Sequence, residues 1–600
     1  MVQANTTGLV NFAASFFKEE QLKDRVLWKK FADQFRTQYD SANNGWRGEY
    51  WGKMMRGGAL IYEFTRDEEL YDVLTESVRD MLTVAESDGR VSTYSREAEF
   101  NGWDMWCRKY VILACEYYLD ICRDESLRGD ILSFIQGCAD YIIARVGQGE
   151  GKTPITETSR AWCGMNACSI LEPIVKLYRL TGDRKYLDFA TYIVDEGGAK
   201  GINIFELAYK NEVYPYQYGV SKAYEMISCF EGLLEYYYVT GIERHKTAVV
   251  NFANAIIESE LSVIGCSGIT HELFDHTSTR QTVRYEGESQ ETCVTVTWMK
   301  FCARLLALTG ESKFADCMEQ SFYNAYLSTL NTEHNESTNV NERAKGNLTA
   351  YTFIPADSYS PLIAKRRGTP IGGFQFLPDG SYYGCCACIA SAGVGMLAKS
   401  IVTADERGIT VNFFESGTYT LQYGGATVVI KQETDYPLNG KIRIFVSTSA
   451  PVSFKLRIRI PAWSGKSGYE VLEREWSEDE VTVDYPMELR TQLPKSWDED
   501  LIYVPGAYTA RHKDEEDNYI ALFRGPITLA VDSRSGKAAD SVFDFEPVGE
   551  VCDDREIAEG VPCLLKMRFT DRSGETFYLV DYSSAGKDWR TEIAAWLRTK

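Results

Sequence analysis

Apolar residues recur at helical spacing through the first two thirds of the chain. In the stretch KAYEMISCFEGLLEYYYVTG, for example, Met226, Phe230, Leu233 and Tyr237 fall on one stripe. Such stretches alternate with a recurring phrase in which a Gly- or Asp-containing turn precedes charged and then apolar residues. The phrase occurs at nearly regular intervals, at Asp67, Asp124, Asp183, Ile242 and Glu311. A period of about 58 residues is typical of one helical hairpin with its connections.

Hairpins of this kind must stack to bury their apolar faces, either as an open solenoid or as a closed (α/α) toroid. A sixth, degenerate copy of the phrase is expected at Asp405, after a long insertion that lacks helical periodicity. An insertion of that length is more typical of an active-site loop than of a solenoid repeat. We therefore expect the hairpins to close into an (α/α)6 barrel.

After about residue 406 the spacing of apolar residues changes from 3.6 to 2. Short alternating runs such as GITVNFF, TYTLQY, KIRIFVS and SFKLRIRIP follow one another between Gly, Pro and Asn residues, a pattern typical of an antiparallel β-sandwich. A second cluster, NYIALFRGPITLAVD and FYLVDY, continues the pattern. The predicted fold class is α+β multidomain: an (α/α)6 barrel over residues 1–405 and antiparallel β-sandwich material over residues 406–600, in one or two modules.

Composition and charge limit the classes of molecule that the protein is expected to bind. The chain has 86 acidic and 64 basic residues, a formal net charge of −22, and a surface this negative repels nucleic acid and anionic lipid. No run of 18 apolar residues appears, so we expect no membrane span. The N-terminal segment MVQANTTGLVNFAASFFKEE lacks the pattern of a secretory signal, so the expected location is cytoplasmic, or periplasmic or secreted if a signal was removed before residue 1. The sequence does not determine whether the protein forms a homo-oligomer.

Cys293 and the run Cys385-Cys386-Ala387-Cys388 stand out from the other cysteines, most of which are expected to be small buried hydrophobes in helices. Cys293 follows Glu291 by two positions, so in an extended segment both side chains point to the same side. The adjacent Cys385 and Cys386 supply two further thiols. Three thiolates and one carboxylate suit tetrahedral Zn²⁺. The alternative is that these are unrelated core cysteines.

The context of both motifs favours the functional alternative. Glu291-Thr292-Cys293 follows a polar loop and opens the amphipathic stretch VTVTWMKFCARLLALTG. Cys385-Cys386 ends the Gly- and Tyr-rich segment DGSYYGCC and opens an apolar stretch. Both pairs are therefore predicted at helix N-termini, where the helix dipole stabilises a thiolate.

At these motifs the sequence resembles the β-L-arabinofuranosidase-type glycoside hydrolases of family 127. The resemblance covers nearly the whole chain and is most specific at E-T-C and C-C. Longer phrases also carry it: WRGEYWGKMMRGG, FNGWDMWCRKY, RAWCGMNACSILEPIVKLYRLTGD, KAYEMISCFEGLLEYY, QETCVTVTWMK, MEQSFYNAYLSTLN and ALFRGPITLAVD.

The resemblance implies a retaining exo-glycosidase that acts on a glycoside or oligosaccharide. In the family the glutamate and three cysteines of these motifs hold zinc, which gives Glu291, Cys293, Cys385 and Cys386 as ligands. Cys385 matches the family's nucleophile, and Glu272, in GITHELFDH, matches its glutamate acid/base. The implied mechanism attacks the anomeric carbon with a metal-activated thiolate and recycles a proton through the glutamate.

Other residues are weaker candidates. Glu319 and Tyr351 match substrate-pocket positions of the family, but a helix-surface acid and a core tyrosine are equally good interpretations. Three loop acids rival Glu272 and are expected to be solvated charges: Asp275, Glu286 and Glu288.

Four tryptophans could stack on a sugar ring, and at least half of them are expected in the core instead. They are Trp46, Trp51, Trp103 and Trp162, of which Trp103 is the one assigned to substrate binding. Arg108 and Lys109 are expected either to face an anionic sugar or to lie on a solvated helix face.

The substrate is the least defined part of the prediction. Family enzymes that act on arabinofuranose use several pocket histidines, whereas this chain has only five histidines in all. We expect terminal L-arabinofuranose or a related plant cell-wall sugar. Two alternatives remain: a non-catalytic carbohydrate-binding protein with a structural zinc, and an (α/α)-toroid uronide lyase or epimerase, which would need a His/Tyr/Arg cluster.

Overall fold

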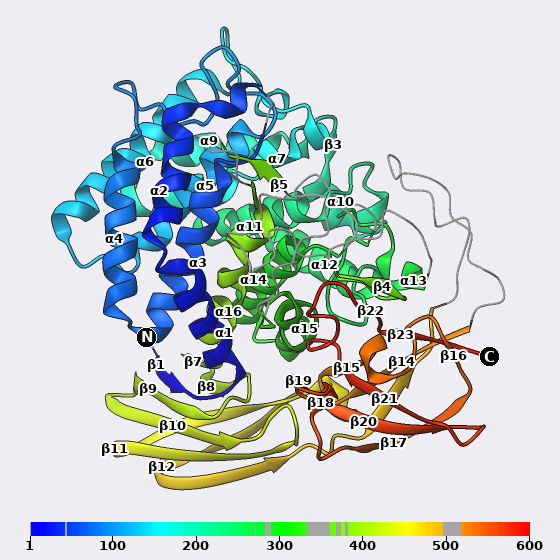
Figure 1. The fold of residues 1–600 in the computed structure, drawn as a ribbon. Coiled ribbons are helices and arrows are strands. Elements are labelled where there is room, and N and C mark those ends of the chain that lie inside the picture. The colour runs from blue at the N-terminus through cyan, green and yellow to red at the C-terminus, as the bar shows by residue number, and fades with distance from the viewer. Residues whose placement is uncertain are drawn as a thin grey trace.

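A helical N-terminal domain is followed by sheet-rich C-terminal domains (Figure 1). In the computed structural model the helices occupy one side of the molecule, and the two large sheets lie along the other. The described residues are 2–42, 45–269, 272–282, 290–330, 332–333, 360–367, 374–377, 382–495 and 518–600.

Helical hairpins form where the repeated phrase predicts them. They are α3 (Glu49–Thr65) with α4 (Glu68–Leu82), α5 (Asp104–Leu119) with α6 (Glu125–Arg145), α8 (Leu171–Thr181) with α9 (Arg184–Asp195), α11 (Ala223–Thr240) with α12 (Glu243–Ser259), and α14 (Thr292–Thr309) with α15 (Ser312–Ser321). Each phrase marks the N-cap of the second helix. Asp67, Asp124 and Asp183 accept hydrogen bonds from backbone N–H groups of the first turn, which is how aspartate stabilises a helix start.

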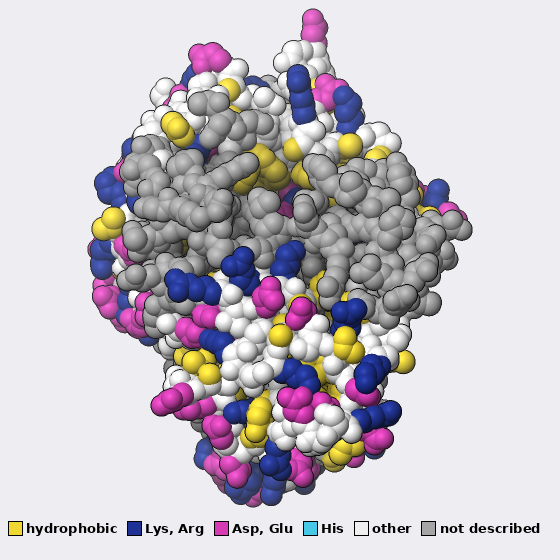
Figure 2. Space-filling model, turned by 45° about the vertical axis from the view of Figure 1, so that its right-hand side comes forward, with side chains coloured by type: hydrophobic (Ala, Val, Ile, Leu, Met, Phe, Trp, Pro, Cys, Tyr) yellow, Lys and Arg dark blue, Asp and Glu magenta, His cyan; other side chains and the backbone are white. Residues whose placement is uncertain are grey.

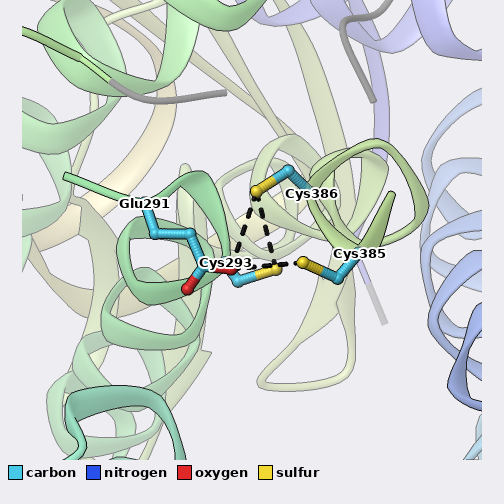
Figure 3. Close-up of side chains that lie close together, drawn as sticks. All are labelled: Glu291, Cys293, Cys385 and Cys386. Atoms are coloured by element: carbon cyan, nitrogen blue, oxygen red, sulfur yellow. Dashed lines mark hydrogen bonds between the residues drawn. The ribbon is translucent and has the colours of Figure 1, made fainter. Parts of the chain in front are cut away.

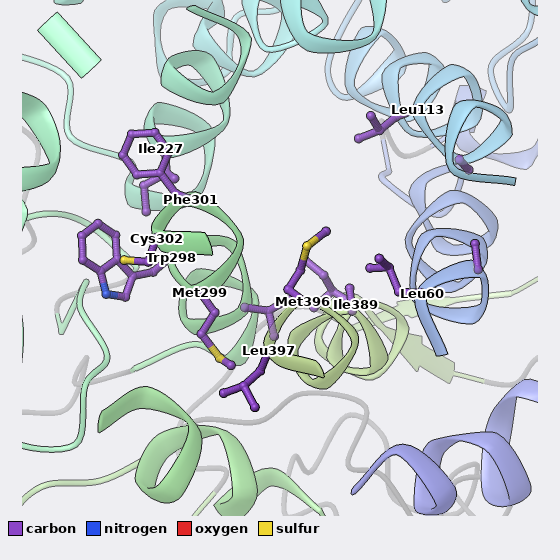
Figure 4. Close-up of a cluster of buried hydrophobic side chains, with 14 of the residues drawn as sticks. Leu60, Leu113, Ile227, Trp298, Met299, Phe301, Cys302, Ile389, Met396 and Leu397 are labelled. Carbon is purple, nitrogen blue, oxygen red and sulfur yellow. The ribbon is translucent and has the colours of Figure 1, made fainter. Parts of the chain in front are cut away.

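The first helix of each hairpin packs against its neighbours in a continuous series. α3 contacts α5, α5 contacts α8, α8 contacts α11, and α11 contacts α14. α16 (Cys385–Ser400) contacts both α14 and α3, so the series returns to its first member. Figure 4 shows side chains from this region, among them Leu60 of α3, Met299 of α14 and Ile389 of α16, which belong to one buried core.

The prediction of a sixth copy of the phrase at Asp405 is wrong. α16 is followed directly by strand β7 (Val402–Asp405), and Asp405 is the last residue of that strand. α16 instead packs against α1 (Leu9–Phe17) from the other end of the chain. The remaining α-helices of the described residues are α2 (Arg25–Thr37), α7 (Met165–Cys168), α10 (Ile204–Lys210) and α13 (Thr277–Arg280), and π-helical turns lie at Lys18–Leu22 and Phe322–Tyr326.

The first large sheet has seven strands in the order β1-β9-β10-β11-β8-β7, with β12 paired to β11. Besides β7, the strands are β1 (Gln3–Thr6), β8 (Gly408–Val411), β9 (Gly417–Tyr423), β10 (Ala426–Thr434), β11 (Lys441–Ile460) and β12 (Gly468–Asp484). Pairing is antiparallel except between β8 and β11. The predicted boundary at residue 405 thus falls between two strands of one sheet, and β1 joins this sheet from the N-terminus.

A second sheet of ten strands follows, with the main order β16-β23-β14-β15-β21-β20-β17. Its strands are β4 (Lys365–Arg366), β13 (Leu489–Gln492), β14 (Asn518–Arg524), β15 (Ile527–Asp532), β16 (Val542–Phe543), β17 (Phe545–Val551), β20 (Lys566–Asp571), β21 (Thr576–Asp581), β22 (Glu592–Ala594) and β23 (Trp596–Thr599). Two-stranded pairs complete the structure: β2 (Gly198–Ala199) with β3 (Ile202–Asn203), β5 (Phe374–Phe376) with β6 (Tyr382–Gly384), and β18 (Glu556–Ala558) with β19 (Val561–Pro562).

A buried ion-pair network joins the helical domain to the first sheet. Arg459 of β11 is fully buried and pairs with Glu319 and Asp316 of α15. Glu319 also accepts hydrogen bonds from Tyr436, at 2.6 Å, and from the indole of Trp463, at 3.1 Å. Because every charged group in this contact has an opposite charge or a hydrogen-bond donor beside it, the interface can bury them.

Charged side chains of both signs lie on the surface of the described residues. On the face shown in Figure 2, acidic and basic side chains of the described residues are interspersed, without a large basic patch. None of the described helices is both long and apolar enough to cross a membrane.

The contact between α8 and α11 depends on a glycine. A Cβ added at Gly232 of α11 would lie 2.8 Å from Leu171 Cβ and 2.9 Å from the backbone nitrogen of Glu172. Gly232→Ala is therefore expected to lower the free energy of unfolding by about 1–3 kcal/mol. Gly129→Ala on α6 is the matched control, because nothing lies within 4 Å of its added Cβ. Thermal unfolding checks both, and a Gly232→Ala protein as stable as wild type would contradict this packing.

Candidate active site

Four potential metal ligands meet where two helices begin. Glu291, Cys293, Cys385 and Cys386 are all buried, and their ligand atoms lie within 4.8 Å of one another (Figure 3). Glu291 Oε1 lies 3.2 Å from Cys385 Sγ and 3.7 Å from Cys386 Sγ. The sulfurs of Cys293 and Cys386 lie 3.9 Å apart. The structure thus brings together all four residues that the sequence predicts as ligands.

The local backbone explains how two distant segments supply these groups. Glu291 is the N-cap of α14 and has extended backbone angles, whereas Cys293 already lies in the first helical turn. The expectation of an extended Glu-Thr-Cys segment is therefore correct only for Glu291. Strand β6 leads through Gly384 into α16, whose first two residues are Cys385 and Cys386. The first turns of α14 and α16 face each other, and their N-terminal dipoles favour negative charge there.

The donor set fits a zinc ion. Three sulfurs and one carboxylate oxygen are a tetrahedral zinc set. Glu291 Oε2 is buried and accepts no hydrogen bond from the described residues. Burial raises the pKa of the Cys293 thiol well above its usual range and also raises the pKa of the Glu291 carboxyl. A bound cation would offset the cost of burying these groups in their charged forms.

Next to this cluster lies a cavity of about 480 Å³. Its described lining residues are Trp46, Glu49, Lys53, Trp103, Trp106, Trp162, Lys222, Tyr224, Glu225, Glu272, Glu291 and Cys385. Cys385 is 7% exposed, whereas Cys293 and Cys386 are fully buried and are not among the lining residues. Among the three thiols of the cluster, Cys385 is therefore the one that faces the cavity.

Glu272 reaches the same cavity from an irregular segment. It has a left-handed backbone conformation with φ of 64°, and its carbonyl accepts a hydrogen bond from the Ala223 N–H at 3.0 Å. Its carboxylate forms a close ion pair with Lys222. The Lys222 ammonium in turn lies 5.4 Å from the centre of the Trp162 ring. The backbone bond and the ion pair together fix Glu272 at the cavity wall.

Glu225 is a second acid in the cavity that the sequence did not single out. It lies in the first turn of α11, is buried, and its Oε2 has no hydrogen-bond partner among the described residues. Burial raises the pKa of Glu225 to about 7, against the opposing effect of Lys222. Near neutral pH this carboxyl can therefore hold or release a proton.

The tryptophans divide between cavity and core. Trp103, the one assigned to substrate binding, lines the cavity together with Trp46 and Trp162. Trp51 is fully buried and donates a hydrogen bond to Ser77 at 2.9 Å, so it belongs to the core. Trp106 also lines the cavity and was missed by sequence reasoning.

Several predicted residues lie elsewhere. Glu319 belongs to the network with Arg459 between the domains and is not among the lining residues, so its assignment to the substrate pocket is wrong: its carboxylate is already occupied. Asp275 is not a solvated loop charge, because it is buried and paired with Arg280. Tyr351, Glu286 and Glu288 lie outside the described residues.

Neither interpretation of Arg108 and Lys109 is correct. Both side chains are buried, and neither lines the cavity. Arg108 pairs with Asp104 and Glu99, while the Lys109 ammonium lies 4.3 Å from the centre of the Trp106 ring. A helix that is buried on nearly all sides has no solvated face to offer.

The missed cavity residues Glu49, Lys53, Lys222 and Glu225 carried a recognisable signal. Each is a charged residue in the phrases WRGEYWGKMMRGG or KAYEMIS, which contain several aromatic and aliphatic residues. Charged residues rarely stay buried without a partner or a function. The sequence analysis assigned no role to these four positions.

Comparison with known proteins identifies the family of this chain. The family model described as β-L-arabinofuranosidase, GH127 catalytic domain, matches residues 9–348, and the GH127 middle domain matches residues 408–487. The chain belongs to glycoside hydrolase family 127. The family model therefore confirms the family that the motifs predict.

Individual relatives of this family 127 chain are distant. A non-reducing end β-L-arabinofuranosidase from Bifidobacterium longum subsp. longum is 21% identical over 457 residues, which cover 69% of this chain and 64% of that protein. The match thus spans less than two thirds of the relative's length.

Two solved structures share the fold along the whole chain. A GH127 β-L-arabinofuranosidase from Geobacillus stearothermophilus T6 is 19% identical with a TM-score of 0.72, covering 100% of both chains. A second GH127 β-arabinofuranosidase is 18% identical with a TM-score of 0.74, covering 100% of this chain and 97% of the other.

The location of Glu319 in the ion-pair network with Arg459 has a measurable consequence. Glu319→Gln removes a buried charge opposite Arg459 and is expected to lower the free energy of unfolding by up to about 3–5 kcal/mol. Binding of zinc or glycoside should not change, since Glu319 does not line the cavity. Glu433→Gln on the exposed face of β10 is the control and should leave the thermal midpoint unchanged. Weaker glycoside binding by Glu319→Gln at unchanged stability would restore the substrate role.

Proposed function

We propose that this chain is a retaining exo-glycoside hydrolase of the β-L-arabinofuranosidase type. The proposed nucleophile is Cys385 and the proposed acid/base is Glu272. The single observation that carries this assignment is that Cys385 both contacts the ligand cluster and faces the cavity that Glu272 lines. Membership of glycoside hydrolase family 127 supports the reaction class.

For the helical domain we propose a closed (α/α)6 barrel, with the active site at one end. The support is the series of contacts from α3 through α5, α8, α11, α14 and α16 back to α3. The C-terminal sheets would form the β-sandwich material predicted from the sequence. In this arrangement the ligands come from the first turns of α14 and α16, two neighbours in the ring.

The proposed cofactor is Zn²⁺, held by Glu291, Cys293, Cys385 and Cys386. When bound, zinc keeps its cysteine ligands deprotonated near neutral pH, where a free thiol is mostly protonated. Cys385 would then be available as a thiolate at the cavity wall.

In the first step the Cys385 thiolate donates an electron pair to the anomeric carbon of the terminal sugar. A C–S bond forms and the glycosidic C–O bond breaks. The leaving oxygen takes its proton from the carboxyl group of Glu272, which becomes a carboxylate. Lys222, paired with that carboxylate, stabilises the charge that this transfer produces.

In the second step a water molecule replaces the departed alcohol. The Glu272 carboxylate takes a proton from the water while the water oxygen attacks the anomeric carbon. The C–S bond breaks, the electron pair returns to Cys385 Sγ, and Glu272 is protonated again. Two displacements at one carbon retain the anomeric configuration.

The expected substrate is a glycoside that ends in L-arabinofuranose or a related plant cell-wall sugar. A cavity of about 480 Å³ lined by Trp46, Trp103, Trp106 and Trp162 offers aromatic faces to a sugar ring, and its acids offer hydrogen-bond acceptors to hydroxyls. The names of the relatives support the same sugar.

The two alternatives have less support. A purely structural zinc would not need a ligand at a cavity wall beside three further acids, Glu49, Glu225 and Glu272. A uronide lyase or epimerase would need a His/Tyr/Arg cluster, and the described lining residues offer Tyr224 but neither histidine nor arginine.

Replacing the nucleophile should nearly abolish turnover. Cys385→Ser keeps a small polar atom but loses the soft thiolate that attacks the sugar. Cys388→Ala is the matched control, because Cys388 lies in the same helix but outside the ligand cluster, and it should remain active. An electrophilic sugar analogue followed by peptide mass spectrometry should label Cys385. Labelling of Cys386, Cys293 or a carboxylate would refute the assignment.

The acid/base is identified by its dependence on the leaving group. Glu272→Gln should slow hydrolysis by roughly 10²–10⁴-fold for poor leaving groups and much less for activated aryl glycosides, which need no proton. Glu225→Gln should change the rate of hydrolysis by the same factor for substrates with poor leaving groups and for activated aryl glycosides. The opposite pattern, with the leaving-group dependence in Glu225→Gln, would transfer the acid/base role to Glu225.

A further inference from the structure

Helix α3 places a buried lysine directly beside the ligand cluster. The Lys53 side chain is 1% exposed, and its ammonium lies 3.6 Å from Cys293 Sγ. It also pairs with Glu49 Oε1 at 2.9 Å, one helical turn earlier. The ring centre of Tyr224 lies 4.7 Å from the same nitrogen. A carboxylate, a sulfur and an aromatic face thus surround this cation.

Burying an ammonium costs several kcal/mol unless anionic or polar groups surround it. Glu49 alone would offset this cost, and the indole of Trp106 holds Glu49 in place by donating to its other oxygen. The contact with Cys293 is a further interaction that the Lys53–Glu49 pair does not require. Its presence indicates that the lysine serves the cluster as well as the helix.

The net charge of the metal-loaded cluster explains why a lysine beside it is useful. Three thiolates and one carboxylate carry four negative charges, and a divalent ion neutralises only two of them. The remaining charge lies at a buried site. A fixed ammonium within hydrogen-bond distance of one sulfur partly neutralises that charge, as partners outside the ligand sphere commonly do for metal sites.

From this geometry we infer that Lys53 is a positioning residue for the metal centre: it donates to Cys293 Sγ and stabilises the thiolate-rich, metal-loaded cluster. Glu49 and Trp106 hold the lysine in place. The inference rests on the proposed function in one respect, namely that the cluster binds zinc.

Loss of the ammonium should therefore weaken zinc binding. The Lys53 ammonium lies 3.6 Å from Cys293 Sγ, so it stabilises the cluster most when the cluster carries the net negative charge of the loaded state. Lys53→Met is expected to lower zinc affinity by about 10–100-fold, the usual effect of removing a partner outside the ligand sphere. Lys53→Arg, which restores the charge, should recover most of the affinity.

The experiment measures zinc affinity of the full chain by competition with a chromophoric chelator under reducing conditions. Lys53→Gln is included because it keeps a neutral donor, so it separates charge from hydrogen bonding and remains available if Lys53→Met does not fold. Lys399→Met is the control, since Lys399 lies on α16 but pairs with Glu63 at the surface. Circular dichroism verifies the fold of each variant.

Weaker binding by Lys53→Met and Lys53→Gln, with recovery in Lys53→Arg and no change in Lys399→Met, would support the inference. Wild-type zinc binding together with unchanged affinity in both neutral variants would overturn it and leave the proposed zinc site intact. A wild-type protein that binds no zinc would overturn both.

Discussion

The meeting of two helix N-termini is the constraint on which the rest of this site depends. α14 and α16 each present their first turn to the other, so Glu291 and Cys293 face Cys385 and Cys386 although the two pairs are far apart in the sequence. Four groups that can carry negative charge are thereby buried at one point. In their charged forms these four groups can be buried together at low cost only with cations beside them.

Buried charges in the cavity beside the ligand cluster are likewise paired with opposite charges. Lys53 with Glu49, and Lys222 with Glu272, are oppositely charged pairs that bring ionisable groups into a largely buried cavity. Glu225 lines the same cavity without a hydrogen-bond partner for its Oε2 among the described residues. Charges held in fixed positions need little reorganisation during a reaction, which is how such sites stabilise developing charge.

Much of this could be predicted from sequence because it depends on local patterns. The repeated turn phrase located the helical hairpins, since an N-cap aspartate acts within one helical turn. The two ligand motifs, Glu291-Thr292-Cys293 and Cys385-Cys386, were evident from residue type and from the spacing within each motif. Contacts between distant segments were not predictable in this way: Gln3 of β1 pairs with Thr420 of β9, and Glu319 turns toward Arg459 instead of the cavity. Such outcomes depend on tertiary packing, which helical periodicity does not encode.

The central claim is that a zinc ion is bound by three sulfurs and one oxygen. X-ray absorption at the zinc edge, on protein purified under reducing conditions without chelators, tests this most directly. The account predicts about one zinc per chain, with three sulfur neighbours at ~2.3 Å and one oxygen neighbour at ~2.0–2.2 Å. A shell of only nitrogen and oxygen atoms, or protein that contains no zinc, would contradict it.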